Sequence, residues 1–164
     1  MPSLKKRKHF AQSTASAKQV LSVNRRARYD YAISETLVAG LQLTGTEIKS
    51  LRNRNLSLAE GYIQVNSGQA YLHGVYIAPY GPAGAQNHDP KRIRTLLLHR
   101  GEIDHLMSKT NIQGFTAVPL QLFLSGRFAK LEIGIGKGRK RYDKRALIAK
   151  RDAERDMLRY LKGR

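Results

Sequence analysis

Short segments in which apolar and polar residues alternate occupy the middle of the chain. They are residues 29–34, 39–45, 62–65, 70–77, 118–124 and 128–135. Alternation with a period of two is typical of strands that bury one face of a sheet. The sequences NSGQ (66–69) and SGR (125–127) are turn signals that join two pairs of these strands into hairpins. The middle of the chain therefore predicts a mainly β, antiparallel structure of about six strands.

Two segments with helical periodicity interrupt the strands. TEIKSLRN (46–53) and GEIDHLMSK (101–109) each place apolar residues three or four positions apart, on one face of a helix. A small antiparallel sheet with about two to three flanking helices is suited to closure, because closure removes exposed strand edges. We therefore predict a barrel of the oligonucleotide-binding (OB) type.

Proline and glycine refine the expected last hairpin. Pro119 has no N–H, which predicts that its strand lies at an edge of the sheet or begins near this residue. Gly134, Gly136 and Gly138 are predicted to end the last strand and let the chain bend away. The spacing in GIGKG (134–138) matches neither a Walker loop nor a dinucleotide fingerprint, so it does not indicate a nucleotide site.

Positive charge is concentrated at the two ends of the chain. The net charge is +18; residues 1–28 carry 8 Lys or Arg and no acid, residues 29–136 carry 10 against 8 acids, and residues 137–164 carry 12 against 4. Self-repulsion on this scale favours a polyanionic partner, and nucleic acid fits better than solvated tails or a lipid surface. We expect a flexible basic arm (1–22), an RNA-binding barrel (23–136) and a basic tail (137–164).

Several classes of function lack the residues that they need. The sequence contains no cysteine, which excludes disulfides, thiolate zinc sites and cysteine nucleophiles and favours an intracellular protein. It has no apolar run long enough to span a membrane, and its five histidines show no metal-ligand spacing. We therefore expect no enzyme activity, cofactor, metal or small-molecule substrate. The enzyme alternative, an RNA-processing hydrolase, would depend on His88 or Asp89.

Three basic clusters have the composition of RNA-binding segments. The first holds Asn24, Arg25, Arg26 and Arg28 beside Tyr29 and Tyr31; the second holds Lys91, Arg92 and Arg94; the third holds Lys137, Arg139, Lys140, Arg141, Lys144 and Arg145 around Tyr142. Arginine matches the geometry of phosphate, and an exposed tyrosine can stack on an unpaired base. These clusters predict an RNA-binding protein in which Tyr142 is a stacking residue.

The tail combines good helix formers with little apolar surface. Leu147, Leu158 and Leu161 form one narrow stripe, which charged residues interrupt. An isolated helix of this kind is marginal in water. We expect the tail to be disordered in the free protein and helical when it lies against a partner.

Taken in order, these clusters resemble the SmpB family, whose members bind tmRNA in bacterial trans-translation. The matching blocks are NRRARYDY (24–31), AGLQLTGTEIKSLR (39–52), AYLHGVYIAPY (70–80), HDPKRIRTLLLH (88–99) and VPLQLFLSGRFAKLEIGIGKGRKRYDKR (118–145), followed by the basic tail. The resemblance implies an OB-type barrel that binds the tRNA-like domain of tmRNA. It also implies delivery to ribosomes stalled on non-stop mRNA, where the protein substitutes for an anticodon stem.

The resemblance assigns residues to each partner. The blocks implied to shape or line the tmRNA surface hold Asn24, Arg25, Arg26, Arg28, Glu47, Lys49, Ser50, Arg52, Lys91, Arg92 and Arg94. The segment implied to enter the decoding centre and the empty mRNA channel holds Lys137, Arg139, Lys140, Arg141, Tyr142, Asp143, Lys144 and Arg145, with Leu158, Tyr160 and Leu161 helping the tail to hold a helix. The implied partners are tmRNA and the ribosome, chiefly its small-subunit RNA.

Three residues depart from the family pattern, and one alternative stays open. Thr95 replaces a common lysine before the leucine run, and Gly136 replaces a common alanine. Val38 stands where members often carry an acidic residue, so no acidic contact is assigned there. We expect a cytoplasmic bacterial protein that is a monomer when free. The alternative is a generic ribosome-associated or single-stranded-RNA-binding barrel, which fits nearly all of the residue patterns equally well.

Overall fold

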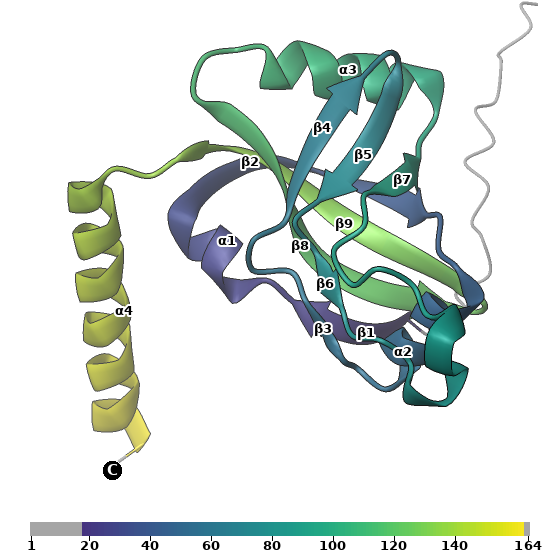
Figure 1. Ribbon diagram of the computed structural model, residues 1–164. Helices are drawn as coiled ribbons and strands as arrows, with labels where there is room; N and C mark the ends of the chain where they lie inside the picture. Colours follow the sequence, from purple (N-terminus) through teal and green to yellow (C-terminus); the bar gives the residue numbers. More distant parts are fainter. Residues whose placement is uncertain (1–17, 163–164) are drawn as a thin grey trace, which may run out of the picture.

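Six antiparallel strands close into a ring (Figure 1). The computed structural model describes residues 18–162. The order around the ring is β8-β4-β5-β7-β2-β9, and β9 pairs with β8 to close it. The strands are β2 (Tyr31–Leu41), β4 (Tyr62–Asn66), β5 (Gln69–His73), β7 (Arg94–Leu97), β8 (Phe115–Ser125) and β9 (Phe128–Gly138). The predicted antiparallel barrel is confirmed.

Smaller elements flank the ring. The helices are α1 (Arg25–Asp30), α2 (Gly45–Arg52), α3 (Arg100–Thr110) and α4 (Arg141–Lys162), with the 3-10 helix η1 (Gly81–Gln86). β1 (Lys18–Val23) pairs with β8 outside the ring, and β3 (Leu56–Ser57) pairs with β6 (Tyr76–Ile77). α3 packs against β4, β8 and β9, at the top of the view in Figure 1. The two predicted helices, α2 and α3, are confirmed.

The core is made of the apolar side chains that alternate along the ring strands. Fully buried members include Leu72, Leu96, Leu122, Leu131, Ile133 and Ile135. A second, smaller cluster of Ala27, Val118 and Leu120 joins α1 to β8. Burial of this apolar surface is the main source of the barrel's stability.

The ring has two narrow junctions: β2 joins β7 at two register pairs, and β4 joins β8 at one. Between β4 and β8, Ile63 opposite Ala117 is the one register pair among the described residues. By contrast, β8 and β9 pair along nearly their whole lengths. The remainder of that edge of β8, from Gln121 to Ser125, pairs with β1. β8 therefore has neighbours along both edges.

The position of Pro119 differs from the prediction. It lies inside β8, which begins at Phe115, so the expectation that the strand begins near Pro119 was wrong. On the edge opposite β9, however, Pro119 lies between the pair of Ala117 with β4 and the pairs of β1 that start at Gln121, where the strand has no register partner. The register of β8 against β9 shifts between Pro119 and Gln121, and such an irregularity accommodates a residue without an N–H.

Both predicted hairpins are confirmed. Between β4 and β5, Ser67 and Gly68 have φ values of 49° and 74°, the two positive values that a type I′ turn requires. Between β8 and β9, Gly126 has a φ of 61°.

The start of β2 also differs from the prediction. The alternation of Tyr29 and Tyr31 suggested a strand, but Tyr29 belongs to α1 and β2 begins at Tyr31. Asn24 explains the difference, because its Oδ1 accepts a hydrogen bond from the Ala27 N–H at 3.0 Å and caps the helix. β2 joins the two predicted segments 29–34 and 39–45 into one continuous strand, which ends at Leu41.

Gly74 divides the segment 70–77, which was predicted to be a single strand. Its φ is 69°, and a Cβ there would lie 2.4 Å from the carbonyl oxygen of Glu60. Glycine alone tolerates this combination. The chain turns at Gly74, so that Tyr76–Ile77 leaves the ring and pairs with β3.

The glycines near the end of β9 act differently from the prediction. Gly134 and Gly136 are buried inside the strand, where a Cβ would lie 2.8 Å from Leu120 Cδ1 and 2.4 Å from the carbonyl oxygen of Ala32, respectively. They permit close packing within the barrel. Gly138, as predicted, is where the strand ends.

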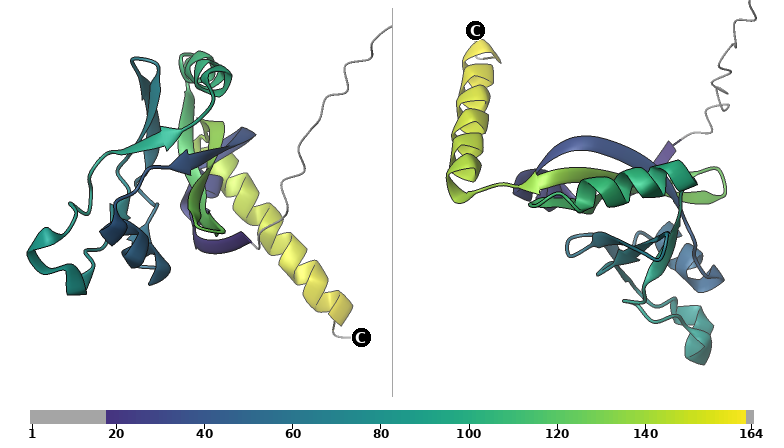
Figure 2. Two further views of the ribbon diagram at one scale, coloured as in Figure 1. Left: turned by 90° about the vertical axis from the view of Figure 1, so that its right-hand side faces the viewer. Right: turned by 90° about the horizontal axis from the view of Figure 1, so that it is seen from above.

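Both basic ends of the chain contain regular structure. Residues 18–22, which were assigned to the N-terminal arm, belong to β1; the rest of that predicted arm lies outside the described residues. In the tail, α4 projects away from the barrel (Figures 1 and 2), and every side chain from Arg141 to Lys162 is at least partly exposed. Disorder of the tail in the free protein stays a prediction. Within residues 18–162, no helix has the length and apolarity needed to cross a bilayer.

Candidate RNA-binding surfaces

α2 is tied to β7 by a buried cluster of charged residues. The Glu47 carboxylate accepts the Thr44 N–H at 2.8 Å, which fixes the first turn of α2. Its Oε1 accepts from Arg94 Nε at 2.8 Å, and its Oε2 accepts from Arg92 Nη2 at 2.6 Å. Glu47 and Arg94 have fully buried side chains, whereas Arg92 is about one-third exposed.

Burial and pairing have opposite effects on these charges. Burial alone would raise the pKa of Glu47, but hydrogen bonds from Arg92 and from the Thr44 amide, with the charges of Arg94 and Arg92, hold it below its ordinary value. Burial lowers the pKa of Arg94, and the charge of Glu47 opposes this. Both groups are therefore charged at neutral pH, in an ion pair that fixes the position of α2.

Arg94 also holds the neighbouring loops. Its Nη1 donates to the carbonyl oxygens of Val75 at 2.7 Å and Arg92 at 3.0 Å, and its Nη2 donates to that of Pro90 at 3.1 Å. With these bonds its donors are directed into the protein. Arg94 is thus placed to support the fold.

The exposed cations of this region form what we call the α2 surface. It consists of Lys49, Arg52, Arg54 and Lys91 together with the partly exposed Arg92. The Lys49 Nζ lies 5.4 Å from the ring centroid of Tyr80. Beneath these residues, Ser50 Oγ donates to the carbonyl oxygen of Ala78 at 2.6 Å. The α2 surface therefore presents cations on a base that buried hydrogen bonds hold in place.

α1 carries a second group of exposed cations. Arg25, Arg26 and Arg28 are exposed along its six residues. Asn24 is buried beneath them, and its Nδ2 donates to the carbonyl oxygens of Leu58 at 2.9 Å and Pro119 at 3.0 Å. Asn24 therefore fixes α1 to β8, as its capping bond fixes the first turn.

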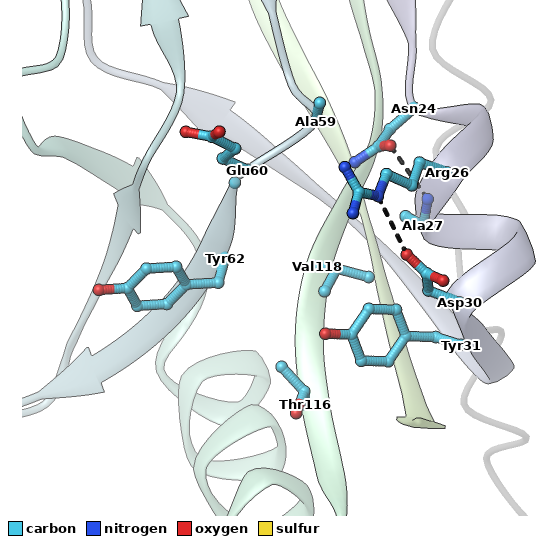
Figure 3. A pocket seen from close by; sticks show the side chains of 11 residues that line it. Asn24, Arg26, Ala27, Asp30, Tyr31, Ala59, Glu60, Tyr62, Thr116 and Val118 are labelled. Carbon is cyan, nitrogen blue, oxygen red and sulfur yellow. Dashed lines mark hydrogen bonds and ion pairs between the residues drawn. The ribbon is translucent and has the colours of Figure 1, made fainter. Parts of the chain in front are cut away.

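A cavity of about 500 Å³ separates α1 from β4 (Figure 3). Tyr31 lies on the side of α1 and Tyr62 on the side of β4, with Arg26 and Glu60 at the rim. Tyr62 is already stacked on His73, with 5.0 Å between the ring centroids. Aromatic walls with polar groups at the rim are suited to a planar ring such as an unpaired base.

The first turn of α4 lies against the end of α1. Lys144 Nζ is 2.7 Å from Asp30 Oδ1, and the Lys140 N–H donates to Asp143 Oδ2 at 3.2 Å. Tyr142 is 66% exposed beside the exposed Arg141 and Arg145. We call the exposed residues Lys140, Arg141, Tyr142 and Arg145 the tail-base surface. It is an aromatic ring among cations, a combination suited to stacking on a base and pairing with phosphates.

Comparison with known proteins identifies the family. The family model described as SmpB protein matches residues 21–163. The chain belongs to the SmpB family.

Individual relatives agree with this. The SsrA-binding protein of Roseiflexus sp. (strain RS-1) is 52% identical over 147 residues, which cover 89% of this chain and 93% of that protein. The SsrA-binding protein of Geobacillus thermodenitrificans (strain NG80-2) is 46% identical over 146 residues, covering 89% and 94%. A solved structure described as "tmRNA-SmpB: a journey to the center of the bacterial ribosome" matches with a TM-score of 0.63 and 42% identity, and covers 73% of this chain and 85% of that chain.

In this SmpB-family chain, the residues predicted to line the tmRNA surface are of two kinds. The side chains of Asn24, Glu47, Ser50 and Arg94 are buried, and each is hydrogen-bonded within the protein. Arg25, Arg26, Arg28, Lys49, Arg52 and Lys91 are exposed, and Arg92 is partly exposed. The predicted set therefore divides into residues that can reach a partner and residues that hold them.

These residues also do not form a single surface. α1 lies near the base of α4 at one end of the molecule, and α2 lies at the other end (Figure 1). Within residues 18–162, the ion pairs of Glu47 with Arg92 and Arg94 join α2 to the second cluster. The first and third clusters meet instead, through Asp30 and Lys144. The sequence did not indicate Asp30, although its position four residues after Arg26 was a visible signal.

Proposed function

We propose that this SmpB-family chain binds the tRNA-like domain of tmRNA and delivers it to ribosomes stalled on non-stop mRNA, where the protein substitutes for the anticodon stem. The names of its relatives, SsrA-binding proteins, and the tmRNA-SmpB structure support this. The observation that carries the proposal is that the α2 surface and the tail-base surface lie at opposite ends of one barrel, with the exposed cations of α1 beside the tail base. Two such surfaces allow two RNA partners to be held at once.

The exposed residues are proposed to make the RNA contacts. The α2 surface faces tmRNA, where arginine and lysine pair with phosphates. Arg25, Arg26 and Arg28 contact tmRNA as well, so that tmRNA extends from α2 to the end of the barrel at which the tail begins. The buried Asn24, Glu47, Ser50 and Arg94 keep α1, α2 and the loop before β7 in place. Their contribution to RNA binding is the fixed geometry of the cations above them.

The tail is proposed to test whether the mRNA channel is empty. A helix of 22 residues is about 33 Å long, and α4 carries exposed cations along its length. Such a helix and an mRNA cannot occupy the channel at the same time. Tyr142 stacks on a ribosomal base, and Leu158, Tyr160 and Leu161 supply the apolar contacts that keep the bound tail helical. Bound mRNA therefore excludes the tail, which restricts rescue to stalled ribosomes.

On this proposal the chain acts by shape and charge. It catalyses no reaction and uses no cofactor, and its place of action is the cytoplasm, where ribosomes translate. The hydrolase alternative would use His88, but His88 bridges Thr46 Oγ1 at 2.9 Å and the carbonyl oxygen of Ile77 at 3.1 Å. These contacts support a structural role for His88 in joining α2 to β6.

Removal of residues 142–164 tests the division of labour. We expect the truncated chain to bind tmRNA with unchanged affinity and to lose peptide tagging in a reconstituted system with non-stop mRNA. The double variant Lys49→Gln with Arg52→Gln is the converse test. Its primary defect should be weakened tmRNA binding. Equal loss of both activities in the two variants would contradict the proposal.

Tyr142→Ala provides a finer test of the stacking role. Loss of one base–aromatic stack costs about 1–3 kcal/mol, so binding to stalled ribosomes should weaken by about 5- to 150-fold while tmRNA affinity is unchanged. Tyr142→Phe keeps the ring and should retain most of the activity. The alternative of a generic RNA-binding barrel predicts instead that poly(U) and bulk tRNA compete as well as tmRNA does in gel shifts.

A further inference from the structure

Asp30 contacts the segment that leads into α4 at two points. Its Oδ1 lies 2.7 Å from Lys144 Nζ, and its backbone carbonyl accepts the Arg139 N–H at 2.8 Å. The first contact joins α1 to the first turn of α4, and the second joins it to the linker before that turn. The side chains of Asp30 and Lys144 are both less than one-third exposed.

Lys144 is held from a second side by an aromatic ring. Its Nζ lies 5.5 Å from the ring centroid of Tyr29, in the range of a cation–π contact. The hydrogen bond from Lys144 also holds the pKa of Asp30 below its ordinary value. The ammonium group is thus placed between an anion and a ring on the same short helix.

The rest of α4 offers little else to set its direction. Every side chain from Ile148 to Lys162 is exposed, so the orientation of the helix depends on its first turn. When the tail is helical on its partner, a change of about 20° at the base of this helix of about 33 Å moves its far end by about 11 Å. The contacts of Asp30 therefore act on the part of the chain where a small rotation has a large effect.

We propose that Asp30 is a positioning residue that sets the direction of the tail helix by holding Lys144. This rests on the proposed function, in which the tail must enter a narrow channel. Asp30 itself touches no RNA in this scheme. Because it is an anion beside a cationic surface, its removal should leave RNA affinity unchanged or slightly higher while it impairs the use of the tail.

The orientation can be measured on the protein alone. The chain has no native cysteine, so spin labels can be placed at Gln113→Cys in the turn between α3 and β8 and at Ala146→Cys in the tail. We expect a narrow distance distribution in the labelled parent and a broader or displaced one in Asp30→Asn. Lys144→Gln should reproduce the change without altering the barrel. Arg26→Gln, which removes the other ion-pair partner of Asp30, is the matched control and should leave the distribution narrow.

The parent and Asp30→Asn are then compared in tmRNA binding and peptide tagging. We expect Asp30→Asn to reduce tagging at least tenfold with no loss of tmRNA affinity, a combination that unfolding of the barrel would not produce. Restored tagging in the charge-swapped double variant, Asp30→Lys with Lys144→Glu, would further support the pairing. Distances that are identical in parent and Asp30→Asn would overturn the inference. If the parent protein did not support tagging, the proposed function would be overturned. The distance measurement does not depend on tagging, so it would still test the role of Asp30.

Discussion

Glu47 and Arg94 form an ion pair in which both side chains are fully buried, with 2.8 Å between Oε1 and Nε. Loss of one partner leaves the other charge without compensation in a medium of low dielectric constant. Replacing Glu47 by Gln should therefore lower the free energy of unfolding by about 3–5 kcal/mol, measured by urea denaturation.

Glu60→Gln is the matched control for this stability prediction. Glu60 is exposed and lies 3.9 Å from the exposed Lys91, a pair of the kind that contributes less than about 1 kcal/mol. A decrease of the same size in both variants would show that the buried cluster has no special role in the fold.

Stability should also depend on pH through Glu47. Its pKa in the folded protein is below its ordinary value, so the stabilisation is fully present above about pH 4.3 and is lost as pH falls through the lower folded-state value. We expect urea midpoints to decrease below about pH 4.3 and the decrease to be smaller in Glu47→Gln. Parallel midpoint curves for parent and variant would contradict the assignment.

The affinity for tmRNA should fall steeply with salt. Each phosphate that the α2 surface neutralises contributes about 0.7–0.9 to the slope of log affinity against log salt concentration. Lys49→Gln with Arg52→Gln should reduce that slope by about this amount for each phosphate that is no longer neutralised, as measured by filter binding at several salt concentrations. Arg100→Gln removes an exposed cation from α3 and should leave the slope unchanged. Equal slopes in the parent, the double variant and Arg100→Gln would show that tmRNA does not bind at the α2 surface.

The rate of amide hydrogen exchange should differ between the base of the tail and its end. Most of α4 is exposed on all sides, and an isolated helix with so little apolar surface is marginal in water. We expect amides beyond Ile148 to exchange rapidly in the free protein and to become protected on stalled ribosomes. Strong protection of these amides in the free protein would contradict the predicted folding of the tail on binding.

The barrel was predictable because its signals are local. Alternation marked the ring strands apart from β7, and turn residues marked both hairpins, including Ser67 and Gly68. α1 was missed because Tyr29 and Tyr31 fit a strand pattern, and only the cap from Asn24 shows that the helix is favoured. Gly74 was missed as a break because its close approach to Glu60 is not local.

The roles of the charged residues were harder to predict, since they depend on distant partners. Glu47 and Arg94 are separated by 47 positions, and nothing in either local sequence distinguishes a buried charge from an exposed one. Lys144 and Asp30 are separated by 114 positions. Composition therefore indicated an RNA-binding protein correctly, but the division into contacting and supporting residues required the tertiary structure.

The narrow junction at Ile63 and Ala117 has a consequence for how the barrel forms and opens. β2, β9, β8 and β1 pair extensively with one another, whereas β4 joins β8 at a single register pair. The chain can thus assemble these four strands as an open sheet first, with β4, β5 and β7 folding over it last. Transient opening in the native state should begin at the same seam, which would expose the core between β4 and β8 while α1 and the base of the tail stay folded.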